Sequence, residues 1–202
     1  VRIHREPFAP DVSATVTAWE PPRRFAYEEG VPLLATEFVV EAREHGTCVV
    51  RVVTGFAQPG PEWEDLLDGA AEGWRMTLLV LRAYLTHFKG RTAANINATF
   101  NTGRPVADRA ALAQRLFGGL GVAGLAAGEA FRTPDGAPLL AGTVEYASDG
   151  YVLLRAEEPA PALFAVSAFP MADPAVSVNV VGHLFGSETA GPEAAGIARR
   201  EE

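Results

Sequence analysis

Cysteine is almost absent from this sequence, which has a single one, Cys48, among 202 residues. An internal disulfide is therefore excluded, and the cytoplasm, a reducing compartment, is the expected location. Cys48 lies within the β-branched run TCVVRVV. Cysteines in strands of this kind usually pack as small hydrophobic residues, so we expect Cys48 to be buried and unreactive.

Basic residues are also scarce. Lysine and arginine together number 17 against 25 acidic residues, and the net charge is -8. Binding to nucleic acid or to an anionic lipid surface needs a basic footprint, so neither kind of partner is expected. Lys89 is the single lysine, and the abundance of alanine, glycine and arginine indicates a GC-rich bacterial genome.

Long apolar runs and targeting patterns are missing. No run approaches the roughly 18 residues of a membrane span, which predicts no membrane insertion. The chain begins with Val1 and lacks the basic-then-apolar layout of a signal peptide. Because an initiating methionine is also missing, we expect that the natural N-terminus is not included.

Motifs for metal and phosphate binding are lacking as well. The sequence has no HxH, HExxH or CxxC spacing and no glycine-rich loop between a strand and a helix. We therefore predict no metal and no cofactor. In the last predicted strand, Ser177, Asn179 and His183 share one face and can in principle meet Ser167. Such residues more often face solvent than form a nucleophile, so no catalytic residue is predicted.

The longest predicted element is a helix over residues 61–90. Its apolar residues recur at three- and four-residue steps and form one stripe of Trp63, Leu66, Leu67, Ala70, Trp74, Leu78, Leu81, Leu85 and Phe88. Pro61 suits the start of the helix and Gly90 its end. Gly69 and Gly73 each weaken a helix by up to about 1 kcal/mol relative to alanine. They indicate a close approach of another backbone, a slight bend, or a widened space in which Trp74 walls a pocket.

Residues 34–56 predict a β-hairpin, because two β-branched runs flank a turn at residues 44–46. A register centred on His45 places three pairs on one dry face: Phe38 with Val52, Val40 with Val50, and Ala42 with Cys48. On the opposite face Arg51 lies diagonally between Glu37 and Glu41. We expect this charge cluster to be solvated and to contribute little stability.

Two shorter strands are predicted ahead of this hairpin, over residues 1–8 and 11–19. Strict alternation along the second puts Val16 on one face and Trp19 on the other. Pro21 and Pro22 then break the strand, and RRFAYEEG resumes it with Phe25 and Tyr27 on one side.

The second half of the chain predicts another α+β unit. Residues 91–97 are expected to be a linker, followed by a short strand at 98–100 and a helix that Asp108 caps. Strands are predicted near residues 128–132, 139–146, 151–157, 163–169 and 175–185. The expected domains are therefore 1–90 and 98–202, and a degenerate duplication of the first unit is a hypothesis.

Residues 1–88 resemble a known family. The runs VTAWEPPRRFAY, LATEFVVEAREHGTCVVRVVTGF and WEDLLDGAAEGWRMTLLVLRAYLTHF are similar to the SRPBCC or START superfamily, and within it to the branch of Aha-type activators of the heat-shock protein 90 ATPase. The resemblance rests on Pro21-Pro22 with Arg24-Phe25, on Thr36-Glu37-Phe38, on Gly46-Thr47, and on Gly73-Trp74 with Leu78, Leu81 and Tyr84-Leu85. It implies an α+β helix-grip fold. In this fold an antiparallel sheet wraps around a long C-terminal helix and leaves a cavity between the sheet and the helix. The strand and two short helices that begin the family's fold are missing before Val1.

The resemblance also implies a function. Members commonly bind lipids, polyketides, hormones or other apolar molecules, so we expect a small apolar ligand between sheet and helix. The expected ligand-binding residues are Phe38, Val40, Val50, Val52, Trp74 and Leu78. Two alternatives stay open: a cyclase- or hydrolase-type enzyme with a polar group such as Tyr84 or Arg75 in the same cavity, and a chaperone-associated ATPase-activator-like protein. A homo-oligomer also stays open.

Overall fold

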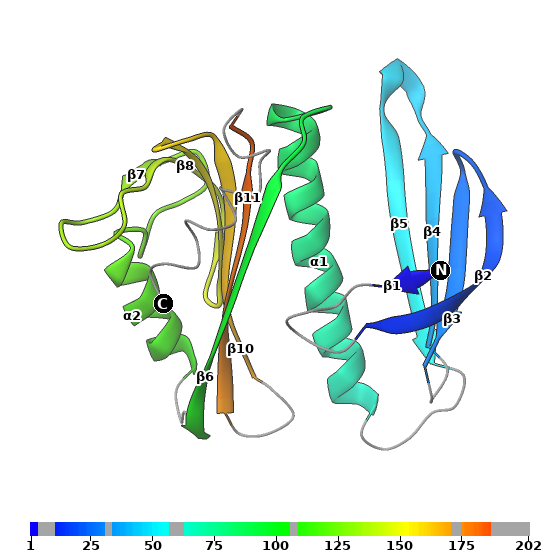
Figure 1. The fold of residues 1–202 in the computed structure, drawn as a ribbon, viewed down its shortest axis with the longest axis horizontal. Helices are drawn as coiled ribbons and strands as arrows, with labels where there is room; N and C mark the ends of the chain where they lie inside the picture. The colour runs from blue at the N-terminus through cyan, green and yellow to red at the C-terminus, as the bar shows by residue number, and fades with distance from the viewer. Residues whose placement is uncertain (4–10, 31–33, 57–62, 106–108, 171–174, 187–202) are drawn as a thin grey trace. The chain divides into compact units, whose positions relative to one another are not determined.

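The computed structural model of the protein describes residues 1–3, 11–30, 34–56, 63–105, 109–170 and 175–186. The chain divides into two compact units, Val1–Met76 and Thr77–Glu202, and each unit has its own antiparallel sheet (Figure 1). The predicted α+β class is confirmed. The predicted long helix is α1, Trp63–His87, and the division between the units falls inside it. The domain boundary expected at residues 90–98 stays a prediction.

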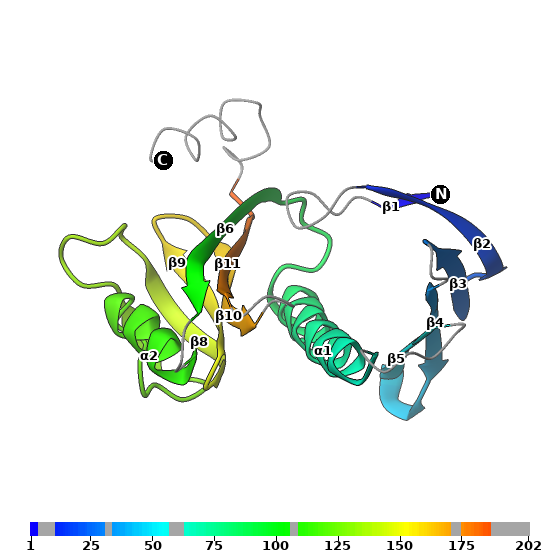
Figure 2. The same cartoon turned by 90° about the horizontal axis from the view of Figure 1, so that it is seen from below.

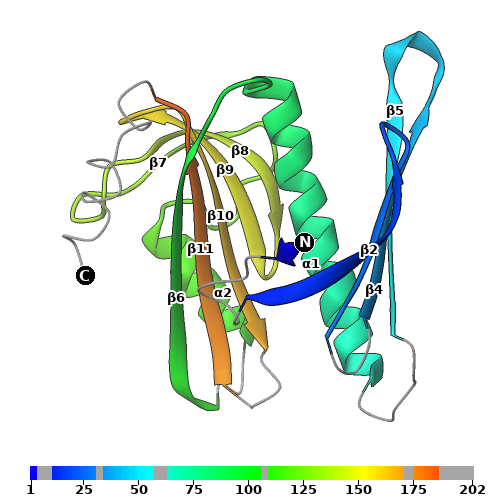
Figure 3. The ribbon, with the colours of Figure 1, turned by 45° about the vertical axis from the view of Figure 1, so that its right-hand side comes forward.

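The first unit holds a five-stranded sheet in the sequential order β1-β2-β3-β4-β5. Figure 3 labels three of its strands, β2, β4 and β5. The strands are β1 (Arg2–Ile3), β2 (Val12–Glu20), β3 (Arg24–Glu29), β4 (Leu34–Ala42) and β5 (Cys48–Phe56). Neighbouring strands pair antiparallel, which short connections allow. Most of the strand predicted over residues 1–8 lies outside the described residues.

The register predicted for the β4–β5 hairpin is confirmed. Phe38 pairs with Val52, Val40 pairs with Val50, and the turn contains His45 at a φ of 60°. Cys48 is exposed, so the expectation that it is buried is wrong. The reason is its position, because it begins β5 at the tip of the hairpin, where its partner Ala42 is exposed as well.

A β-bulge in β2 overturns the predicted faces of that strand. The register shifts between Val16 and Ala18, so that Val16 pairs with Tyr27 while Trp19 pairs with Phe25. Tyr27 and Phe25 lie two residues apart and thus on one face of β3. Trp19 therefore shares the face of Val16 instead of lying opposite, since one extra residue reverses the alternation.

The second unit has a six-stranded antiparallel sheet in the order β6-β11-β10-β9-β8-β7. Its elements are β6 (Ala94–Pro105), α2 (Arg109–Gly119), β7 (Ala130–Arg132), β8 (Ala141–Ser148), β9 (Tyr151–Glu158), β10 (Ala162–Pro170) and β11 (Ala175–Leu184). The predicted order of strand, helix and antiparallel meander is confirmed. Asp108, the predicted helix cap, lies outside the described residues.

The core of the second unit lies between α2 and one face of this sheet. Phe117 of α2 packs in one cluster with Val152 and Leu154 of β9, and Leu154 has no exposed surface. Leu153, which points to the other face, is 1% exposed. The Thr77–His87 part of α1 lies on that other side of the sheet (Figure 2). There Tyr84 stacks on Phe185, the residue that follows β11. The sheet is thus covered on both faces.

The linker predicted at residues 91–97 is partly wrong. Strand β6 begins at Ala94, within the predicted linker. Its residues alternate as in a half-buried strand: Ile96 and Ala98 are half-buried on one face, and Asn95 and Asn97 are exposed on the other. Asparagine is uncommon in strands, so local preference argues against this element. Pairing with the distant strand β11 stabilises it.

Candidate functional site

One face of the first sheet gathers aromatic side chains from three neighbouring strands. Trp19 of β2 pairs with Phe25 of β3, and Phe25 pairs with Phe38 of β4. Tyr27 lies two residues from Phe25 and so points to the same face. Trp74 of α1 contacts Phe38. We call these five residues the aromatic face.

The rings of the aromatic face form a continuous series. Trp19 stands at 87° to Phe25 with ring centroids 5.6 Å apart, and Phe25 lies at 23° to Phe38 with centroids 6.1 Å apart. Trp74 meets Phe38 at 83° and 5.4 Å. Tyr27 lies 5.7 Å from Phe25 and 6.4 Å from Phe38. Aromatic pairs are favourable at about 4.5–7 Å, so each ring is held by a neighbour.

The aromatic face is only partly removed from water. The side chains of Phe25, Tyr27, Phe38 and Trp74 are half-buried, and Trp19 is 69% exposed. Apolar surface gains about 25 cal/mol for each Å² withdrawn from water. Rings that retain accessible surface can therefore gain further by contact with another apolar group.

A hydrogen bond fixes the indole of Trp74. Its Nε1–H donates to Oγ1 of Thr54 on β5 across 2.9 Å. Thr54 pairs with Thr36, which is 2% exposed, and Thr36 pairs with Tyr27. A row of hydroxyl groups thus crosses the sheet beside the phenylalanines. Glu29, two residues beyond Tyr27, adds a carboxyl group to this side of the sheet, and the residue is 4% exposed.

The structure brings most of the predicted ligand-binding residues to this face. Phe38, Val40, Val50 and Val52 share it through the β4–β5 register, and all are half-buried. Trp74 lies against Phe38. Leu78, also half-buried, is one helical turn after Trp74 and belongs to the second unit. That these residues bind a ligand stays a prediction.

Gly73, next to Trp74, is not explained by a close approach of another backbone. Apart from its own stretch of helix, no described residue has an atom within 4 Å of a Cβ atom built on Gly73. Among the described residues, the space beside this position is therefore open. The surroundings of Gly69, the other glycine of α1, lie outside the described residues.

Trp19, Phe25, Tyr27 and Thr54 were not among the predicted ligand-binding residues. The alternation of Phe25 and Tyr27 in RRFAYEEG is a signal for a shared face. The position of Trp19 depends on the bulge in β2, for which the sequence offers no sign. The contact of Thr54 with Trp74 joins residues of a strand and a helix, so it depends on tertiary packing.

The opposite face of the first sheet carries charged residues in exposed ion pairs. Arg24 contacts Glu37 at 2.5 Å and Glu20 at 3.1 Å, and Arg51 contacts Glu41 at 3.4 Å. Arg51 therefore pairs with one of its two predicted partners. The hydrogen bond that Arg24 donates to Glu37, followed by the one it donates to Glu20, raises the pKa of Arg24 above its ordinary value. Exposed pairs of this kind contribute little stability.

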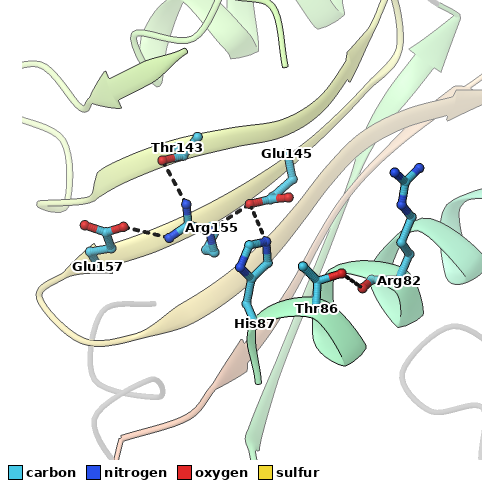
Figure 4. A network of polar contacts seen from close by, with 7 residues as sticks. All are labelled: Arg82, Thr86, His87, Thr143, Glu145, Arg155 and Glu157. Atoms are coloured by element: carbon cyan, nitrogen blue, oxygen red, sulfur yellow. Dashed lines mark hydrogen bonds and ion pairs between the residues drawn. The ribbon is translucent and has the colours of Figure 1, made fainter. Parts of the chain in front are cut away.

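The second unit contains a denser polar network (Figure 4). Arg155 of β9 donates to Glu145 at 2.7 Å, to Glu157 at 2.6 Å and to Thr143 at 3.1 Å. His87, at the end of α1, lies 3.1 Å from the same Glu145 oxygen. The hydrogen bond with Glu145 raises the pKa of the Arg155 guanidinium above its ordinary value, against the opposing effect of burial. The network ties the end of α1 to β8.

His183 and Ser167 do not form a nucleophile and base pair. Asn179 pairs with Ser167. His183 pairs with Leu163, which lies four residues before Ser167 on β10. Four residues of strand span roughly 13 Å, far beyond hydrogen-bond reach. Nδ1 of His183 instead lies 2.8 Å from Oδ1 of Asn95. Burial lowers the pKa of His183 below its ordinary value.

The described residues contain no candidate metal centre and no candidate membrane-spanning helix. In that part of the chain, no three histidine, cysteine, aspartate or glutamate side chains converge in a geometry suited to a metal ion. Neither of its helices has the length and apolar character that crossing a bilayer requires.

The chain is distantly similar in structure to two solved proteins, one from a biosynthetic pathway and one from a biosynthetic locus. The di-domain ARO/CYC StfQ from the steffimycin biosynthetic pathway is 13% identical, with a TM-score of 0.34 over 88% of this chain and 69% of StfQ. DynU16, from the dynemicin biosynthetic locus, is 16% identical, with a TM-score of 0.33 over 94% of this chain and 72% of DynU16. No protein-family model and no curated protein sequence matches the chain.

Proposed function

We propose that the first unit binds a small apolar molecule, of lipid or polyketide type, against the aromatic face. The observation that carries this proposal is the series of contacting rings that keep accessible surface on one side of the sheet. The same proposal assigns the chain to the helix-grip proteins of the SRPBCC superfamily. The sequence runs that resemble this superfamily supply the strands of the face and Trp74.

The chemistry of the face suits a flat ring compound. Phe25 and Phe38 lie nearly parallel, while Trp19 and Trp74 stand nearly perpendicular to them. A planar guest can therefore stack on one pair of rings and meet the edges or faces of the others. Binding sites for small molecules are mostly apolar with a few polar groups, and the hydroxyl row next to the rings supplies such groups.

The test is titration of the protein with 2-isopropylnaphthalene, followed by the probe's own fluorescence. Binding should also raise the melting temperature, because a ligand at 100 times its Kd adds about 2.7 kcal/mol to the stability of the folded protein. Replacing Trp74 with alanine should raise the Kd at least tenfold. Such a loss corresponds to about 1.4 kcal/mol, the value of about 55 Å² of apolar contact.

Phe100→Ala is the matched control, because it removes another aromatic ring from the protein. Phe100 lies on β6 of the second unit and is 60% exposed. Its replacement should leave the Kd within twofold of the unmodified protein. Equal losses of affinity in the two variants, or no binding by the unmodified protein, would refute the proposal.

A further inference from the structure

The indole of Trp74 makes two contacts that act on different parts of the ring system. Its N–H is donated to the Thr54 hydroxyl at 2.9 Å, and its plane stands at 83° to the ring of Phe38. Tryptophan has a single hydrogen-bond donor and no acceptor in its side chain. The contact with Thr54 therefore uses all of the hydrogen-bonding capacity of Trp74.

We propose that Thr54 is a positioning residue that determines specificity: by holding the indole N–H of Trp74 it sets the angle of the ring and withholds the donor from the ligand. Since this inference deepens the proposed function, it rests on that function. The ligand then meets Trp74 as a π surface. A ligand with a carbonyl group gains nothing from Trp74 over a hydrocarbon of the same shape.

The position of Thr54 in the sheet supports this role. Thr54 is half-buried on β5, and its pairing partner Thr36 is 2% exposed. Thr54 and Trp74 are themselves half-buried, so the bond is partly screened from water, and removing the hydroxyl group leaves the indole N–H without this partner. Phe38 lies two residues from Thr36 on β4. The two contacts of the indole therefore fall on adjacent rows of one face, which defines its orientation.

Replacing Thr54 with valine tests the inference, because valine has nearly the same shape and lacks the hydroxyl group. The freed N–H of Trp74 can then donate to a ligand carbonyl group. The measured quantity is the Kd for 2-isopropylnaphthalene divided by the Kd for 2-acetylnaphthalene, two probes of similar size. We expect Thr54→Val to raise this ratio roughly threefold to tenfold, the range for one net hydrogen bond.

Thr54→Ser is the conservative variant, and it should keep the ratio of the unmodified protein because it retains the hydroxyl group. Thr15→Val is the control for the substitution itself. Thr15 is exposed on β2, and its partner Glu28 lies on the face opposite Tyr27. This variant should leave both affinities unchanged.

A second measurement needs no ligand. Nuclear magnetic resonance detects the indole N–H signal of each tryptophan, and Trp74→Phe identifies the signal of Trp74. In Thr54→Val this signal should exchange with deuterium at least tenfold faster, while Thr54→Ser should retain slow exchange. Unchanged exchange in Thr54→Val would show that Thr54 does not hold the indole.

The outcomes separate the two proposals. If neither probe binds the unmodified protein, the proposed function fails, and the exchange experiment still judges the role of Thr54 in fixing the indole. If both probes bind and Thr54→Val weakens them equally, the specificity role is refuted while the proposed function stands. A ratio that rises in Thr54→Val and returns in Thr54→Ser supports the inference.

Discussion

Replacing Phe38 with leucine removes the central ring of the aromatic face while leaving an apolar side chain in its place. Phe38 lies 6.1 Å from Phe25, 6.4 Å from Tyr27 and 5.4 Å from Trp74, so three ring contacts are lost together. An aromatic pair contributes about 0.5–1.5 kcal/mol beyond the area that it buries. Because the rings are half-buried, we take the low end for each pair and expect a loss of about 1–2 kcal/mol in the free energy of unfolding.

Urea unfolding followed by tryptophan fluorescence measures this loss. Because the chain has two compact units, the unfolding transition that tryptophan fluorescence reports is analysed by itself. Val53→Ala is the control, since Val53 lies on the opposite face of β5 and is 48% exposed. It should change stability by less than about 0.5 kcal/mol. A Phe38→Leu protein as stable as this control would show that the ring contacts do not stabilise the sheet.

Two further predictions concern other positions. Burial lowers the pKa of His183 in the folded protein. As the pH falls through about 6.5, the unfolded chain therefore binds more protons at this residue than the folded protein does. The free energy of unfolding then decreases with falling pH until the folded-state pKa is reached. His183→Gln should therefore lose less stability than the unmodified protein between pH 7 and pH 5 in urea unfolding, and parallel pH profiles would contradict this. Gly73→Ala should raise the free energy of unfolding by about 0.5–1 kcal/mol, because a Cβ at this helical position meets no atom of the described residues within 4 Å outside its own stretch of helix. Destabilisation in thermal or urea unfolding would show that the space beside Gly73 is not free.

Patterns that are local in the sequence predicted their part of the fold well. The β4–β5 register follows from two alternating runs around one short turn, and the observed partners Phe38 and Val52 are the predicted ones. The helix α1 was recognisable from its apolar period and its end signals. In both cases neighbouring residues carry enough information to set the structure.

Features that depend on distant contacts were missed. Strand β6 contains alternating asparagines, and its pairing with β11 outweighs their weak preference for strands. The bulge in β2 shifts the register by one residue, which moved Trp19 to the aromatic face. The hydrogen bond between Trp74 and Thr54 spans 20 positions of sequence and forms only when the helix lies on the sheet.

The central claim is that the aromatic face binds an apolar molecule, and the valine methyl groups of β5 test it most directly. Val50 and Val52 lie on the same side of the sheet as the aromatic face, whereas Val49 and Val53 alternate with them and lie on the opposite side. In methyl nuclear magnetic resonance spectra, 2-isopropylnaphthalene should shift the signals of Val50 and Val52 and leave those of Val49 and Val53 in place. Shifts confined to Val49 and Val53, or no shift in any of the four at saturating probe, would contradict the claim.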